Sequence, residues 1–141
     1  MITKIWHFIF LFNIGLLGSA EVHKPNILFI FADDQCYETI QSFGLTDIET
    51  PNLDRLVNSG TSFTRAYNMG SWSGAVCVAS RHMLNTGRFI WEAEKASQKA
   101  EQERESGRFW SEYMKKAGYR TYMTGKWHVR AMAEKCFDVV R

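Results

Sequence analysis

The chain has 141 residues, enough for one domain with a hydrophobic core, and its 45% hydrophobic and 23% charged residues are typical of a globular protein. The formal net charge is only +2 and the basic residues form no run, which argues against a nucleic-acid partner. The three cysteines, Cys36, Cys77 and Cys136, form no CxxC pair, so a structural zinc site has little support.

The first 20 residues have the pattern of a secretory signal peptide. Lys4 gives a positive start, residues 5–17 are almost wholly apolar, and residues 18–20 (Gly-Ser-Ala) are the small residues that a signal peptidase requires. The alternative is an uncleaved membrane anchor, but the run is shorter than the roughly 20 residues that a span needs. We expect a secreted or periplasmic protein with a mature domain over 21–141 and no stable membrane insertion after cleavage. In such a protein an odd cysteine count indicates one thiol with a separate role.

The first half of the mature sequence contains two predicted strands and a predicted helix. Residues 27–32 are a short β-branched and aromatic run, typical of a strand buried on both faces in a parallel sheet. A helix is predicted over 50–60, with Thr50 as N-cap and Pro51 in its first turn. Residues 61–67 alternate in the manner of a strand.

The second half continues the alternation of helices and strands. A short helix ends at Gly87, and residues 92–105 are rich in Glu, Lys, Gln and Ala, which predicts a solvated helix or a mobile loop. An amphipathic helix is predicted over 106–117, with Phe109, Trp110, Tyr113 and Met114 on one side, and a strand over 119–124. This order predicts an α/β layered fold, in which sites form where strands end.

Four motifs occur in order along the chain: NILFIFADDQ, TPNLDRL, CVASRHMLNTGR and TGKWH. Together they resemble the N-terminal half of the sulfatases, formylglycine-dependent enzymes of the alkaline-phosphatase-like superfamily. The resemblance covers most of residues 24–128. It implies an alkaline-phosphatase-like α/β/α layered fold with a mostly parallel sheet, incomplete here. On this basis residues 21–141 are the N-terminal part of a sulfatase catalytic domain.

The resemblance assigns a metal and a modification. It implies that Asp33 and Asp34 hold a divalent cation, usually Ca²⁺, a hard ion that prefers carboxylate oxygens. It implies that a maturation enzyme oxidises Cys77 to formylglycine, which also contacts the cation and sits at a helix N-terminus that favours negative charge. From the residues alone, a pair of aspartates after a strand is more often a helix cap or turn than a metal site. For Cys77 alone, a buried structural cysteine is the default interpretation, and a disulfide with Cys36 or Cys136 is the other alternative.

The resemblance also assigns three catalytic partners of Cys77. Arg81, one helical turn away, orients the formylglycine, and Lys126 binds the sulfate oxygens. His128 contacts the formylglycine hydroxyls and takes the proton that releases sulfate. In an extended segment its side chain would project the same way as that of Lys126. The alternatives are a surface arginine and a histidine that packs beside Trp127.

The resemblance implies a sulfuric ester hydrolase that acts on a sulfated small molecule or polysaccharide. Two departures are visible: Ala79 stands where many sulfatases have proline, and the family's remaining metal ligands would come after residue 141. A catalytically incompetent sulfatase fragment and a phosphoester hydrolase of the same superfamily remain alternatives. A serine hydrolase is disfavoured because Trp72 occupies the nucleophile position of the elbow-like stretch 70–74.

Overall fold

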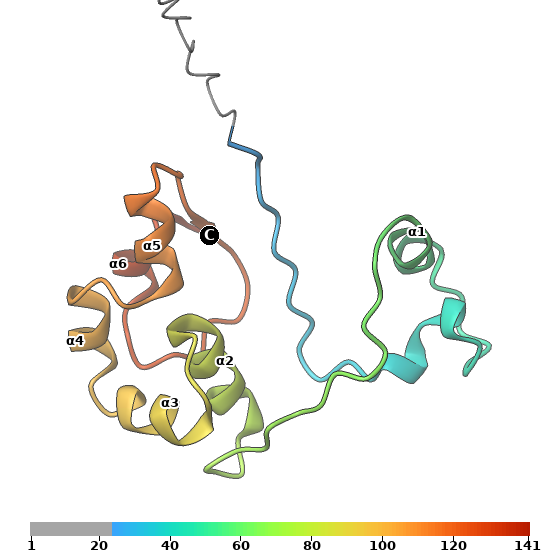
Figure 1. Ribbon diagram of the computed structural model, residues 1–141, viewed down its shortest axis with the longest axis horizontal. Coiled ribbons are helices and arrows are strands. Elements are labelled where there is room, and N and C mark those ends of the chain that lie inside the picture. Colours follow the sequence, from blue (N-terminus) through green and yellow to red (C-terminus); the bar gives the residue numbers. More distant parts are fainter. Residues whose placement is uncertain (1–23) are drawn as a thin grey trace, which may run out of the picture. The chain divides into compact units, whose positions relative to one another are not determined.

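The computed structural model describes residues 24–141 and is drawn in Figure 1. The chain divides into two units, Met1–Phe31 and Ala32–Arg141. The predicted signal peptide, residues 1–20, lies outside the described residues. None of the helices over 24–141 is long and apolar enough to cross a membrane.

Residues 24–31, the described part of the first unit, have no regular secondary structure. The prediction of a buried strand over 27–32 is therefore wrong for the described chain. Its apolar side chains are exposed instead, with Leu28 at 85% and Ile30 at 72% of their full accessible surface. A strand that is buried on both faces depends on neighbouring strands and covering helices, and the part of the chain described here pairs none with it.

The second unit begins with two short 3₁₀ helices and one α-helix, η1 (Tyr37–Thr39), η2 (Gln41–Phe43) and α1 (Pro51–Ser59). The predicted helix over 50–60 is thus confirmed, with Pro51 in its first position. Thr50 does not cap the helix with its side chain. Its hydroxyl accepts a hydrogen bond from the Gln41 amide and donates one to Asp54, both at 2.9 Å, so it ties η2 to α1. The strand predicted over 61–67 does not form.

Four further helices follow in chain order: α2 (Val76–Thr86), α3 (Ile90–Ser97), α4 (Ala100–Glu105) and α5 (Trp110–Lys116). The helix predicted to end at Gly87 is α2, and Gly87 takes the left-handed conformation (φ 64°) that favours glycine. The prediction of a solvated segment over 92–105 is only partly right. Small residues of α3 and α4 such as Ala93 and Ala100 are buried, because their short side chains allow close packing.

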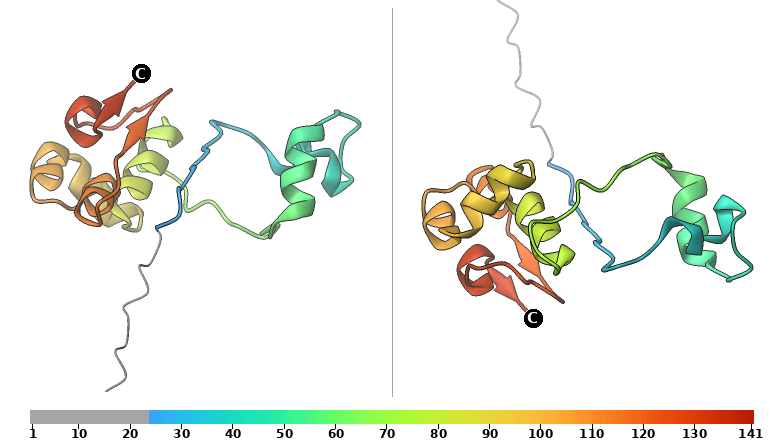
Figure 2. Two further views of the ribbon diagram at one scale, coloured as in Figure 1. Left: turned by 90° about the horizontal axis from the view of Figure 1, so that it is seen from above. Right: turned by 90° about the horizontal axis from the view of Figure 1, so that it is seen from below.

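A two-stranded parallel sheet closes the chain. Strand β1 (Tyr122–Met123) pairs with β2 (Val139–Val140), with Tyr122 opposite Val139, and helix α6 (Ala133–Cys136) lies between them in sequence. Figure 2 shows the two strands side by side next to the C-terminus. The strand predicted over 119–124 is therefore confirmed in shortened form. Over residues 24–141, the layered, mostly parallel sheet expected for the fold class is represented by these two strands only.

The hydrophobic core of the second unit lies around Phe109, Cys136 and Phe137. Phe109 and Cys136 are fully buried, and the Trp127 ring meets Phe137 edge-on with 5.4 Å between centroids. Tyr113, predicted on the apolar side of its helix, is 57% exposed. The core thus joins α5, α6 and the loop that follows β1.

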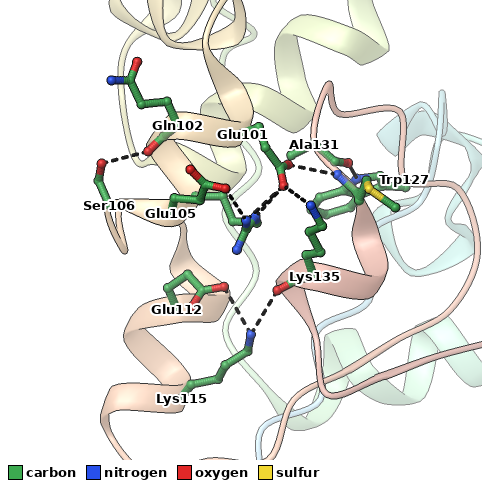
Figure 3. Close-up of polar contacts among 11 residues, drawn as sticks. Glu101, Gln102, Glu105, Ser106, Glu112, Lys115, Trp127, Ala131 and Lys135 are labelled. Atoms are coloured by element: carbon green, nitrogen blue, oxygen red, sulfur yellow. Dashed lines mark hydrogen bonds and ion pairs between the residues drawn. The ribbon is translucent and has the colours of Figure 1, made fainter.

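A polar network ties α4 to α6 and to the loop before it (Figure 3). Glu101 pairs with Lys135 at 3.2 Å, and its other carboxylate oxygen accepts a hydrogen bond from the Met132 amide at 3.3 Å. Lys115 of α5 donates to the Lys135 carbonyl at 3.3 Å. These contacts fix the end of the β1–α6 connection against the helices.

Candidate active site

The N-terminus of α2 presents Cys77. The thiol is half-buried and free, so the alternative of a disulfide with Cys36 or Cys136 is wrong. Helix α2 lies within the described residues, and its first turn carries no acidic side chain. Its N-cap residue, Ala75, makes no side-chain hydrogen bond to the helix. The helix dipole and the first amide groups are therefore available to stabilise negative charge near Cys77.

Asp33 forms ion pairs with two of the predicted catalytic residues. Lys126 Nζ lies 2.6 Å from one carboxylate oxygen, and Arg81 Nη2 lies 3.3 Å from the other. The hydrogen bond from Lys126, and after it the one from Arg81, lowers the pKa of Asp33 although partial burial opposes this. Asp33 is therefore a carboxylate at neutral pH, held between two cations.

Lys126 connects Asp33 to Cys77. Its pKa is raised first by the hydrogen bond to Asp33, and the Cys77 side chain adds a further hydrogen bond in the same direction. The lysine side chain keeps 44% of its surface exposed. The structure thus brings Asp33, Lys126 and Cys77 together, with the ammonium group partly open to solvent.

Arg81 is buried in the same cluster. The residue is only 8% exposed, and Nη1 donates a hydrogen bond to the Lys126 carbonyl oxygen while Nη2 reaches Asp33. The alternative of a surface arginine is therefore wrong. Because both terminal nitrogens bind protein groups, Arg81 is suited to hold the cluster together.

His128 and Asp34 share an uncommon backbone conformation. They are the non-glycine residues with positive φ in the described chain, at 52° and 62°. The left-handed region is costly for such residues and is often found at functional sites. The extended geometry assumed for 126–128 is absent, so the expected common direction of Lys126 and His128 does not follow. His128 is exposed, and the structure gives it no hydrogen bond to Cys77, Lys126 or Asp33.

The aspartates suit part of a calcium site. A carboxylate has about four acceptor positions, and Arg81 and Lys126 use only two of those on Asp33. Asp34 is exposed and has no hydrogen bond or ion pair to another described residue. Over residues 24–141 no three His, Cys, Asp or Glu side chains gather closely enough to hold a metal. The described residues therefore fit as a fraction of the about six to eight oxygen ligands that calcium takes.

His82, which the sequence patterns did not single out, is the fully buried neighbour of Arg81. Its Nε2 accepts a hydrogen bond from the Arg130 amide at 3.3 Å, and its ring lies 6.2 Å from that of Trp72. Burial, and after it the charges of Arg130 and His128, lowers its pKa from 6.5 to about 4. The imidazole is therefore neutral at pH 7. No spacing rule points to His82, because its partner lies 48 residues away in sequence.

Comparison with known proteins gives one consistent result. The profile of the Sulfatase family matches residues 25–139. The chain is 36% identical over 116 residues to an N-acetylgalactosamine-6-O-sulfatase and 33% identical over 111 residues to an N-acetylglucosamine-6-O-sulfatase, both from Bacteroides thetaiotaomicron, and each alignment covers 79% of the chain. It is 35% identical over 125 residues, 85% of its length, to arylsulfatase A of Bos taurus.

These alignments cover 22%, 19% and 24% of the three relatives, so the chain spans about a fifth of their length. No solved structure matches the chain.

Proposed function

Because this chain belongs to the sulfatase family, we propose that its second unit supplies the nucleophile-bearing part of the active site of a sulfuric ester hydrolase. The observation that carries the proposal is the cluster of Asp33, Arg81, Lys126 and Cys77. Asp33 pairs with Lys126 at 2.6 Å and with Arg81 at 3.3 Å, and Lys126 in turn interacts with the Cys77 side chain. On this proposal residues 21–141 are the N-terminal part of the catalytic domain.

Cys77 is the proposed position of the formylglycine, whose hydrated aldehyde supplies a hydroxyl nucleophile for sulfate ester cleavage. The helix N-terminus around Cys77 favours the negative charge that such a hydroxyl develops. A dedicated maturation enzyme is the implied partner, and the half-buried thiol at the start of α2 would be its target. Ala79 lies two residues after Cys77, where many sulfatases have proline, so the maturation enzyme would have to accept alanine at this position.

Lys126 and Arg81 have different proposed roles. Lys126 offers a partly exposed ammonium beside Cys77 and can bind sulfate oxygens as a point charge. Arg81 is buried and engaged with Asp33 and the Lys126 carbonyl, so we assign it to orientation of the cluster. His128 is the proposed proton carrier. It lies two residues after Lys126 in a strained conformation of the kind often found at functional sites, and this conformation supports the assignment.

Asp33 and Asp34 are the residues that would hold part of a divalent cation, with calcium as the implied ion. The cation would offset negative charge at the nucleophile. Asp33 would then share its carboxylate between the cation and the two basic side chains, for which it has free acceptor positions.

The substrate class that we propose is a sulfated small molecule or polysaccharide. Two of the relatives are named for 6-O-sulfated amino sugars and a third for aryl sulfates, so both kinds belong in the test panel. A secreted or periplasmic location, expected from residues 1–20, would place the protein where such polysaccharides occur.

The decisive experiment combines mass analysis with an activity assay. The protein is expressed with a formylglycine-generating enzyme and calcium, and the mass of the peptide that contains residue 77 is measured by mass spectrometry. We expect the mass loss of a thiol converted to an aldehyde, together with hydrolysis of an aryl sulfate and not of the matching aryl phosphate. Preferred hydrolysis of the phosphate would replace the proposal by a phosphoester hydrolase.

Cys36 provides a matched control because it is a free, exposed cysteine outside the cluster. Cys77→Ala should abolish both the mass change and the turnover, whereas Cys36→Ala should leave both intact. Equal turnover in the two variants would remove Cys77 from the mechanism.

A further inference from the structure

The loop between β1 and α6, residues 124–132, carries both Lys126 and His128. It is held near its start by Arg81, which donates to the Lys126 carbonyl, and at its end by the bond from the Met132 amide to Glu101. Within the loop, Trp127 Nε1 donates to the Ala131 carbonyl at 2.6 Å (Figure 3). We call this segment the β1–α6 loop.

His82 anchors the middle of the β1–α6 loop. Its side chain is fully buried, and Nε2 accepts the hydrogen bond from the Arg130 amide at 3.3 Å. An imidazole can accept at Nε2 only when it is neutral and carries its proton on Nδ1. Burial beside Arg130 and His128 favours that neutral form. His82 is thus suited to accept this hydrogen bond from the loop at neutral pH.

The anchored loop contains a strained residue. His128 takes a positive φ of 52°, between the bond of Arg81 to residue 126 and the bond of His82 to residue 130. Such a conformation persists only where its surroundings over-determine it. Arg81 and His82 are consecutive residues of α2, so one turn of helix fixes the backbone on both sides of His128.

We propose that His82 is a positioning residue, which fixes the β1–α6 loop through the Arg130 amide and so sets the backbone from which Lys126 and His128 project. Its effect on the fold of the loop stands on the structure alone. Its effect on turnover rests on the proposed sulfatase function.

The first arm of the test measures amide hydrogen exchange in the loop, without substrate. His82→Leu removes the acceptor, whereas His82→Gln keeps one at a similar reach. We expect Arg130 to exchange about tenfold faster in His82→Leu and close to the wild-type rate in His82→Gln. Unchanged exchange at Arg130 in His82→Leu would overturn the proposal.

Asn85→Ala is the matched control. Asn85 is also buried on α2, but its Nδ2 donates to the Arg81 carbonyl at 2.8 Å, within the helix. In Asn85→Ala, the amide exchange rate of Arg130 should not increase more than the exchange rates of the other amides in the second unit. If Asn85→Ala and His82→Leu accelerate exchange equally and throughout the unit, His82 has only a general structural role and the proposal fails.

The second arm measures turnover of an aryl sulfate by the matured protein. A misplaced loop should lower kcat about tenfold with a smaller change in KM, and His82→Gln should restore it. A loss of kcat in His82→Leu without faster exchange at Arg130 would contradict the positioning role. If the wild-type protein itself cleaves no sulfate, the proposed function fails, while the exchange arm still decides the role of His82.

Discussion

Replacement of the buried carboxylate Glu103 should destabilise the second unit more than any other single charge change in its helices. Only 2% of its side chain is exposed, and it accepts from Arg108 Nε at 2.6 Å and from Arg88 Nη2 at 2.9 Å, with Lys99 at 3.8 Å. Arg88 lies in the connection before α3 and Arg108 in the connection before α5. Glu103 therefore links both of these connections to helix α4. The hydrogen bond from Arg108 lowers the pKa of Glu103 against the effect of burial.

The expected magnitude follows from the exposure of the partners. Removal of one member of a buried ion pair costs about 3–5 kcal/mol. Arg88 and Arg108 keep 32% and 42% of their side-chain surface, so both can recover hydration when Glu103 becomes Gln. We therefore expect Glu103→Gln to lower the free energy of unfolding by about 2–3 kcal/mol at pH 7.

The assay is urea unfolding followed by circular dichroism. Glu105→Gln is the control, because Glu105 is 62% exposed and its pair with Arg104 at 3.2 Å should contribute less than about 1 kcal/mol. Since the folded pKa of Glu103 is lowered, its contribution is present above pH 4.5 and is lost as pH falls through the folded pKa. A Glu103→Gln variant as stable as the Glu105→Gln variant would refute this reasoning.

Three further results are expected. The pKa of His82 is lowered from 6.5 to about 4 in the folded protein, so protonation of this side chain favours the unfolded state. The free energy of unfolding should therefore begin to fall below pH 6.5 and be about 2 kcal/mol lower at pH 5 than at pH 7. Urea titrations that give the same free energy of unfolding at pH 5 and pH 7 would contradict this. Phe109→Ala should cost about 3–5 kcal/mol because Phe109 is fully buried, whereas the 75% exposed Phe89 should tolerate alanine; calorimetry compares the two. Burial raises the pKa of Cys136 to about 12, so iodoacetamide should label exposed Cys36 and spare Cys136 in peptide maps of the folded protein.

Local signals predicted the helices better than the strands. Pro51 at the start of α1 and Gly87 at the end of α2 act through the backbone of their own turn, so their sequence pattern is sufficient. The apolar run over 27–32 gave the opposite outcome, because a strand exists only through hydrogen bonds to a distant partner. Of the three predicted strands, all within the described residues, only the one that contains β1 pairs with another strand, and the pairing covers two residues.

The candidate site divides in the same way. The motifs placed Cys77, Arg81, Lys126 and Asp33 in one site, and the structure brings these residues together. The positive φ of His128 could not be predicted, since the contacts that hold the loop on either side of it come from a helix more than 40 residues away in sequence. His82 was missed because its importance depends on a backbone amide supplied by a different part of the chain.

The ion pairs of Asp33 also have a kinetic consequence. They connect residues 48 and 93 positions apart, whereas the bond within the β1–α6 loop from Trp127 spans only four. Closure of longer loops carries a larger entropic cost, and contacts of high sequence separation form slowly. The charged cluster should therefore be among the last native contacts to appear, so a signal from Asp33 and Lys126 would report the completion of folding, later than any signal from the aromatic core.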